Sequence, residues 1–233
     1  MAVKRFYKAA SVRPADAIFA IVLDERPVRT PGGRTLALDS AALAGAIVAE
    51  WAGQGDEIDH RTMPLTQFAN TAIDRVRADR SFALAQIEQT GRHDLVCYRA
   101  DAPPELMRRE ALAWDQPLAW VRERHGLDLA VTAGIASIPQ PDASFARLRE
   151  ELAVMDPFVL TGLAATVPIL KSTVLALALH DGLMDARAAH AAAHVDEAFQ
   201  AEKWGLDSEA ETRLKALLGE LETTDRFMRL ARA

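Results

Sequence analysis

The spacing of apolar residues changes near residue 60, and this change limits the folds that the chain can adopt. Before it, residues 17–23 form a short run rich in Ile, Val and Phe, and residues 28–30 and 34–38 resemble short strands. The segments between these runs contain the Pro and Gly that tight turns require. We therefore expect two successive hairpins that form a small antiparallel sheet.

Helical spacing follows the predicted sheet. Ser40 and the residue before it offer an N-cap, apolar residues recur at helical intervals as far as Trp51, and two glycines then end the pattern. From about residue 61 onwards nearly every periodic segment is helical. The expected fold class is α+β. A small N-terminal α/β domain, residues 1–60, has one face of its short antiparallel sheet covered by this helix. A larger all-helical domain, residues 61–233, follows.

Several elements of the helical domain can be placed in advance. Pro117 is expected either to kink a helix that includes Trp114 or to mark the start of a new helix, because proline lacks the backbone N–H that a helix interior uses. A lone strand is expected at residues 127–132 and a helix at about 142–154. The last third is expected to form three helices, at 169–179, at 185–203 and from Ser208, which has capping-box spacing to Glu211.

Composition excludes several classes of protein. The hydrophobic share is 50% but aromatics are only 6%, so much of the apolar character comes from alanine, which favours helix. The 27 basic and 33 acidic residues give a net charge of −6, which is wrong for a general nucleic-acid binder. The single cysteine, Cys97, allows no intrachain disulfide. The most apolar stretch, residues 158–179, is interrupted by Pro168 and Lys171, so no membrane insertion is expected.

Motifs for catalysis, metals or nucleotides are weak. No glycine cluster has the spacing of a phosphate loop, and no nucleophile elbow occurs. His93 precedes Cys97 by four residues, but a small buried thiol is the favoured interpretation. His190 and His194 have metal-like spacing, yet Ala191 stands where a zinc protease needs glutamate, so an exposed pair is expected. We expect no catalytic residue, no metal, no cofactor and no small-molecule substrate.

Residues 195–205 form an unusual segment near the C-terminus. Helical projection places Val195 and Phe199 on a buried stripe, with Asp196 and Lys203 on an adjacent polar ridge. Asp196 and Glu197 both fall outside the buried stripe. Taken by itself, this ridge is typical of a solvated helix face.

Short motifs in a fixed order give this ridge a second interpretation. They lie at residues 5–8, 23–31, 50–54, 63–74 and 196–205. Together they resemble the assembly chaperones for the alpha subunit of the ATP synthase catalytic sector, called assembly factor 2 in mitochondria. The resemblance spans nearly the full length and implies a small N-terminal α/β domain with a larger helical one. It begins at residue 5, so a bacterial member that acts in the cytoplasm is expected.

The resemblance implies binding and not catalysis. Such a chaperone holds the free alpha subunit and masks the surface that will later face the beta subunit. Family positions reported as sensitive match Trp51, Asp196 and Glu197. Packing in the core is the simpler role for Trp51, whereas the acidic pair is the better candidate for partner contact. The alternative is a small-molecule enzyme or ligand-binding protein without a recognisable motif, which should have a deep pocket with convergent polar groups.

Overall fold

The computed structural model describes residues 3–134, 136–205 and 207–233. The chain divides into two compact units, which we describe separately. The first unit comprises Met1–Phe82, Asp156–Gly162 and Arg226–Ala233. The second comprises Ala83–Met155 and Leu163–Asp225.

The first unit contains the expected antiparallel sheet. Strands β2 (Ala10–Ala15) and β3 (Ile18–Leu23) pair from Ala10 opposite Leu23 to Ala15 opposite Ile18. Strands β4 (Arg26–Pro27) and β5 (Ala37–Leu38) also pair with β3, and β1 (Val3–Lys4) pairs with β6 (Glu57–Ile58). The sequence pattern did not predict β2, because this strand lies at the sheet edge, is mostly exposed and contains Pro14.

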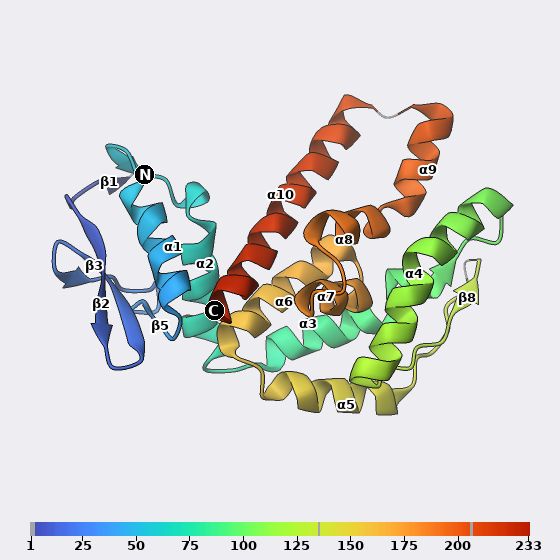
Figure 1. The fold of residues 1–233 in the computed structure, drawn as a ribbon, viewed down its shortest axis with the longest axis horizontal. Coiled ribbons are helices and arrows are strands. Elements are labelled where there is room, and N and C mark those ends of the chain that lie inside the picture. The colour runs from blue at the N-terminus through green and yellow to red at the C-terminus, as the bar shows by residue number, and fades with distance from the viewer. Residues whose placement is uncertain (1–2, 135, 206) are drawn as a thin grey trace. The chain divides into compact units, whose positions relative to one another are not determined.

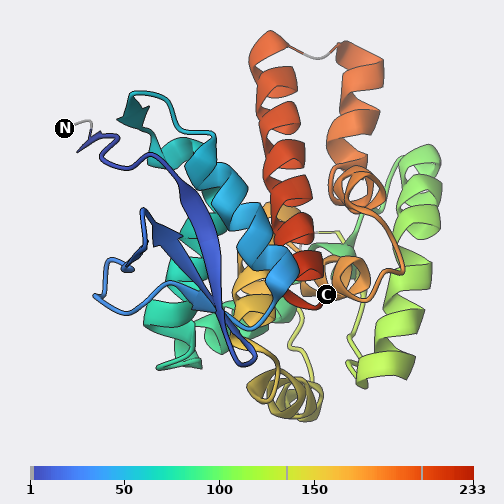
Figure 2. The same ribbon diagram turned by 60° about the vertical axis from the view of Figure 1, so that its left-hand side comes forward.

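Helix α1 (Ala41–Ala52) packs across this sheet, as expected (Figures 1 and 2). Its N-cap is Ser40, whose hydroxyl accepts a hydrogen bond from the N–H of Leu43 at 3.1 Å. Helix α2 (Pro64–Thr71) buries Leu65 and Ala69 in the same core, and the helical turn Ala72–Val76 adds Ala72 and Ile73. The first compact unit therefore extends past residue 60, because α2 completes the cover of its core.

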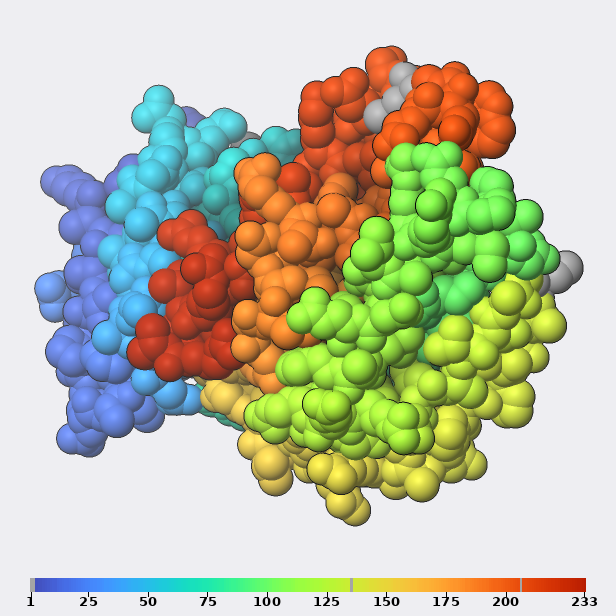
Figure 3. All heavy atoms as spheres, turned by 45° about the vertical axis from the view of Figure 1, so that its right-hand side comes forward, coloured from blue at the N-terminus to red at the C-terminus, as the bar shows by residue number. Residues whose placement is uncertain are grey.

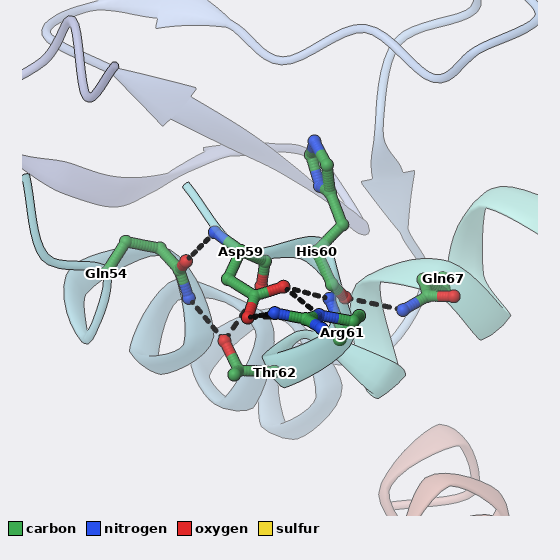
Figure 4. A network of polar contacts seen from close by, with 6 residues as sticks. All are labelled: Gln54, Asp59, His60, Arg61, Thr62 and Gln67. Carbon is green, nitrogen blue, oxygen red and sulfur yellow. Dashed lines mark hydrogen bonds and ion pairs between the residues drawn. The ribbon is translucent and has the colours of Figure 1, made fainter. Parts of the chain in front are cut away.

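A polar network connects the end of α1 to the short 3₁₀ helix His60–Thr62 (Figure 4). The side-chain oxygen of Gln54 accepts the N–H of Asp59 at 2.7 Å, and its amide nitrogen donates to the Thr62 hydroxyl at 3.0 Å. The Glu50 carboxylate accepts the N–H groups of Leu65 and Thr66, each at 2.8 Å, where α2 begins. These bonds give a structural role to the motif at residues 50–54 and to the beginning of the motif at residues 63–74.

The second unit is almost entirely helical. The remaining elements of the chain are α3 (Ser81–Arg92), the 3₁₀ helix Leu95–Cys97, β7 (Tyr98–Arg99), α4 (Pro104–His125), β8 (Thr132–Ala133), α5 (Asp142–Ala153), α6 (Pro157–Leu170), α7 (Thr173–His180), α8 (Ala186–Ala193), α9 (Val195–Trp204) and α10 (Ser208–Ala231). Helices α3, α6 and α10 also contribute residues to the first unit. Strands β7 and β8 form a short parallel pair. The mixed architecture confirms the α+β class.

Two expected features of this unit are revised by the structure. Helix α4 continues through Pro117, so no new helix starts there, and Pro117 is buried on the same helix as Trp114 and Val121. Burial of that face offsets the cost of proline inside the helix. The strand expected at 127–132 is reduced to β8, which starts at Thr132.

Helix boundaries in the last third also differ. The segment expected as one helix at 169–179 is split by Lys171, which has a positive φ of 51°, and by Ser172, the N-cap of α7. The segment 185–203 is split at His194, between α8 and α9. Helix α10 does start at Ser208, but its cap is Asp207, whose carboxylate accepts the N–H of Ala210 at 2.8 Å. Short-range capping chemistry therefore decides boundaries that apolar periodicity misses.

Among the residues that the structure describes, no helix is both long enough and apolar enough to cross a membrane.

Candidate partner-binding site

Helix α9 is fixed against α4 by a layer of charged and aromatic side chains. Phe199 is buried, and the cations of Arg109 and Lys203 each lie 5.3 Å from the centre of its ring. Arg109 donates to both carboxylate oxygens of Glu202 at 2.8 Å, and Lys203 donates to Glu105 at 3.2 Å. Lys203 therefore contacts α4, although the sequence placed it on a solvated ridge.

Asp196 and Glu197 lie side by side in the first turn of α9, and both are partly buried. Glu197 forms a long ion pair of 3.4 Å with Lys171, the first residue after α6. Asp196 faces Glu110 of α4. Negative charge at this end of a helix is also favourable for the helix dipole. The acidic pair is thus partly engaged within the unit.

A cavity of about 340 Å³ lies beside the acidic pair, and we call it the α9 pocket. It is lined by Leu95, Trp114, Lys171, Ala193, Asp196, Glu197 and Gln200. The indole N–H of Trp114 donates to the carbonyl of Ala192 at 2.8 Å, which fixes this ring in the pocket wall. The pocket combines apolar and aromatic surface with two carboxylates and one ammonium group.

A second hollow of about 250 Å³, the α9–α10 groove, lies on the other side of α9. Glu197 and Gln200 border both hollows, so this part of α9 forms a ridge between them. Trp204 also lines the groove and is 79% exposed. Helices α4, α8 and α9 are exposed together in Figure 3, where α4 is green and the other two are orange. An exposed tryptophan beside a charged ridge is typical of a protein-binding surface.

Trp51 lies in the first unit and not on α9. It is 7% exposed, packs edge to face against Tyr7 at 5.8 Å, and accepts the Tyr7 hydroxyl at its carbonyl oxygen at 2.7 Å. The structure therefore brings Asp196 and Glu197 together and places Trp51 in the core of the other unit.

The cysteine considered for catalysis and the two histidines considered for metal binding are buried or partly buried. Cys97 is fully buried, as expected, and burial raises the pKa of its thiol to about 12. The expectation of an exposed histidine pair is wrong: His194 is buried and its ring stacks on that of His190 at 4.3 Å. Burial lowers the pKa of His190. Within the described ranges, no group of three or more His, Cys, Asp or Glu residues could hold a metal ion.

The sequence pattern missed two contributors to this site, Glu110 and Lys171. The buried face of α4 contains Leu106 and Glu110 as well as Trp114. The available signal was the position of Glu110, one helical turn before the buried Trp114. Lys171 gave no signal, because the turn between α6 and α7 was expected to be helical.

Comparisons with known proteins agree with this architecture. The model of the family described as ATP12 chaperone protein matches residues 4–122. Atp12 from Paracoccus denitrificans is 40% identical, with a TM-score of 0.93 over 99% of both chains. A mutant of the same protein, with lysine in place of an aspartate, is 39% identical, with a TM-score of 0.93 over 99% of this chain and 98% of that one.

A chaperone candidate from Agrobacterium tumefaciens is 33% identical, with a TM-score of 0.89 over 98% of this chain and 85% of that one. The family match covers half of the chain, and these similarities extend over nearly all of it. The chain therefore belongs to the ATP12 chaperone family, the ATP synthase assembly chaperones that its motifs resemble.

Proposed function

We propose that this protein binds the free alpha subunit of ATP synthase and masks its assembly surface until the beta subunit joins. The observation that carries the proposal is the match to Atp12 over 99% of both chains. An unassembled subunit exposes apolar surface that tends to aggregate, and a temporary partner lowers the amount of that surface. We place this activity in the bacterial cytoplasm.

The α9 pocket and the ridge beside it are the proposed contact surface. Asp196 and Glu197 provide negative charge, and the partly exposed Leu95 provides apolar surface. A basic side chain of the alpha subunit fits this combination, because its aliphatic stem can pack on the apolar lining while its cation meets the carboxylates. Among the described residues of the lining, Lys171 is the one cation, and its ion pair with Glu197 is long and half-exposed.

Size-exclusion chromatography tests the proposed partner. We expect co-elution with isolated alpha subunit at a ratio of one to one, without added nucleotide or metal. No co-elution is expected with the assembled alpha-beta ring, because the beta subunits then cover the masked surface. Absence of a complex with free alpha, or stable binding to the completed ring, would reject the masking function.

Truncation of the acidic pair tests the proposed surface. Asp196→Ala is expected to weaken binding of the alpha subunit by about 2 kcal/mol or more, because a desolvated basic group loses its partner. Glu197→Ala should weaken it less, since Lys171 already neutralises this side chain. Isothermal titration calorimetry measures both, and thermal melts show whether folding is unchanged.

The matched control is Glu150→Ala, which removes an exposed carboxylate from α5. This variant should bind like the wild type. Unchanged affinity for both acidic-pair variants would remove α9 from the contact surface. A large fall in melting temperature would instead assign the pair to holding the second unit together.

A further inference from the structure

Glu110 is an acidic side chain in a fully enclosed place. It lies on α4 and is 1% exposed. Its carboxyl oxygens share one backbone donor, the N–H of Ala100, at distances of 2.9 and 3.2 Å. An ionised carboxylate is costly to bury unless a cation or several donors compensate it. Glu110 therefore needs either a bound cation or a proton.

The charged groups that act most strongly on Glu110 come from two neighbouring elements. Asp196 faces it from α9, and Arg99 lies at the end of β7. The guanidinium of Arg99 is already engaged, because it donates to Asp115 at 2.9 Å and lies over the ring of Trp114 at 5.0 Å. Glu110 thus faces a second acid across the contact between α4 and α9.

Other titratable groups lie on elements that pack against α4. The helices α7 and α8 also pack on α4, and they contribute His180, Arg187 and His190. None of these three is among the main influences on Glu110. The charge at the contact between α4 and α9 therefore depends mainly on Glu110 and Asp196.

One carboxyl oxygen of Asp196 needs a hydrogen-bond donor. Its Oδ1 atom is shielded from solvent and accepts no hydrogen bond from the described part of the chain. Two buried carboxyl groups in contact repel each other when both are ionised, whereas one proton between them forms a strong hydrogen bond. A donor is therefore missing at a place where Glu110 can provide it.

We propose that Glu110 keeps a proton in the folded chain at a pH where an ordinary glutamate has lost it, and that it donates a hydrogen bond to Asp196, so that it positions the carboxylate bordering the α9 pocket. Glu110 is a positioning residue, because it acts on the partner through Asp196. Its effect on binding rests on the proposed function, whereas its protonation does not.

The electrostatic environment of Glu110 favours its protonated form. Burial raises the pKa of Glu110, and the negative charge of Asp196 raises it further, against the opposing effects of Ala100 and Arg99. The folded chain thus keeps this proton to higher pH than the unfolded chain does. Its stabilising effect is complete below the ordinary glutamate pKa and is lost as pH rises through the raised pKa. Binding should weaken over that same interval.

Carbon-13 NMR of glutamate carboxyl groups tests the proton directly. One resonance should titrate above the ordinary glutamate range and should be absent in Glu110→Gln. In Asp196→Asn the same resonance should titrate at lower pH, because the neighbouring charge is gone. Titration of Glu110 in the ordinary range, or no response to Asp196→Asn, would overturn the proposal even if the alpha subunit binds.

Binding of the alpha subunit as a function of pH tests the positioning role. Wild-type affinity should fall about fivefold or more as pH passes the midpoint found by NMR. Glu110→Gln should bind tightly at every pH, because its amide oxygen can accept from Ala100 while its amide nitrogen donates to Asp196. Glu110→Ala should bind weakly throughout.

Glu123→Gln makes the same chemical change at an exposed position of α4 and should keep the wild-type pH profile. A Glu110→Gln profile that still falls with pH would overturn the positioning role. If no variant binds the alpha subunit, the proposed function fails, and the NMR result alone decides the state of Glu110.

Discussion

Replacement Trp51→Ala is expected to lower the free energy of unfolding by about 3 to 5 kcal/mol. The indole is 7% exposed and lies in the core that includes Tyr7, Leu43 and Ile47. Truncation removes a large apolar surface and leaves a cavity between α1 and its neighbours. Urea unfolding followed by circular dichroism measures the loss, with a check that the two compact units unfold in one transition.

The matched control for Trp51 is Trp204→Ala. Trp204 is 79% exposed, so its truncation should change stability by less than about 0.5 kcal/mol. Any loss of partner binding by Trp51→Ala should follow its loss of folded protein. Wild-type unfolding combined with absent binding would instead make Trp51 a contact residue.

Replacement Asp94→Ala is expected to cost about 3 kcal/mol, because it leaves three buried backbone donors without an acceptor. Asp94 is fully buried and accepts the N–H of Val96 at 3.3 Å. Its other oxygen accepts the N–H groups of Thr173 and Val174 at 2.7 and 3.0 Å, in the first turn of α7. One side chain therefore caps two helical segments of the second unit.

The stability of Asp94→Ala should be measured at pH 8, because burial raises the pKa of Asp94 to about 6 and the side chain is ionised there. Asp185→Ala is the control. Asp185 is an exposed N-cap that accepts the N–H of Ala188 at 2.8 Å, and its loss should cost about 1 kcal/mol. Equal losses for both variants would show that burial adds nothing to the role of Asp94.

Apolar periodicity predicted the elements whose packing is local. Helix α1 begins after the expected Ser40 cap, and α5 and α10 lie where helical spacing placed them. The breaks at Lys171 and His194 were missed because they occur inside apolar or alanine-rich runs that continue smoothly in sequence. At Pro117 the reverse happened: a new helix start was considered there, but α4 continues through this residue because its face of the helix is buried.

The candidate site was predictable only in part. Asp196 and Glu197 could be selected because their motif resembles a known family, and the structure places both at the α9 pocket. The partners that give the pair its electrostatic character, Glu110 and Lys171, are distant in sequence. A buried glutamate and a loop lysine have no distinctive pattern, so their roles follow only from the packing of α4, α7 and α9.

Displacement by the beta subunit tests the central claim most directly. A purified complex of this protein with alpha subunit would be mixed with increasing amounts of isolated beta subunit, and the species would be resolved by native mass spectrometry. We predict that the chaperone is released in proportion to the alpha-beta complex that forms, because both partners cover the same surface of alpha. A stable species that contains all three proteins would contradict this account.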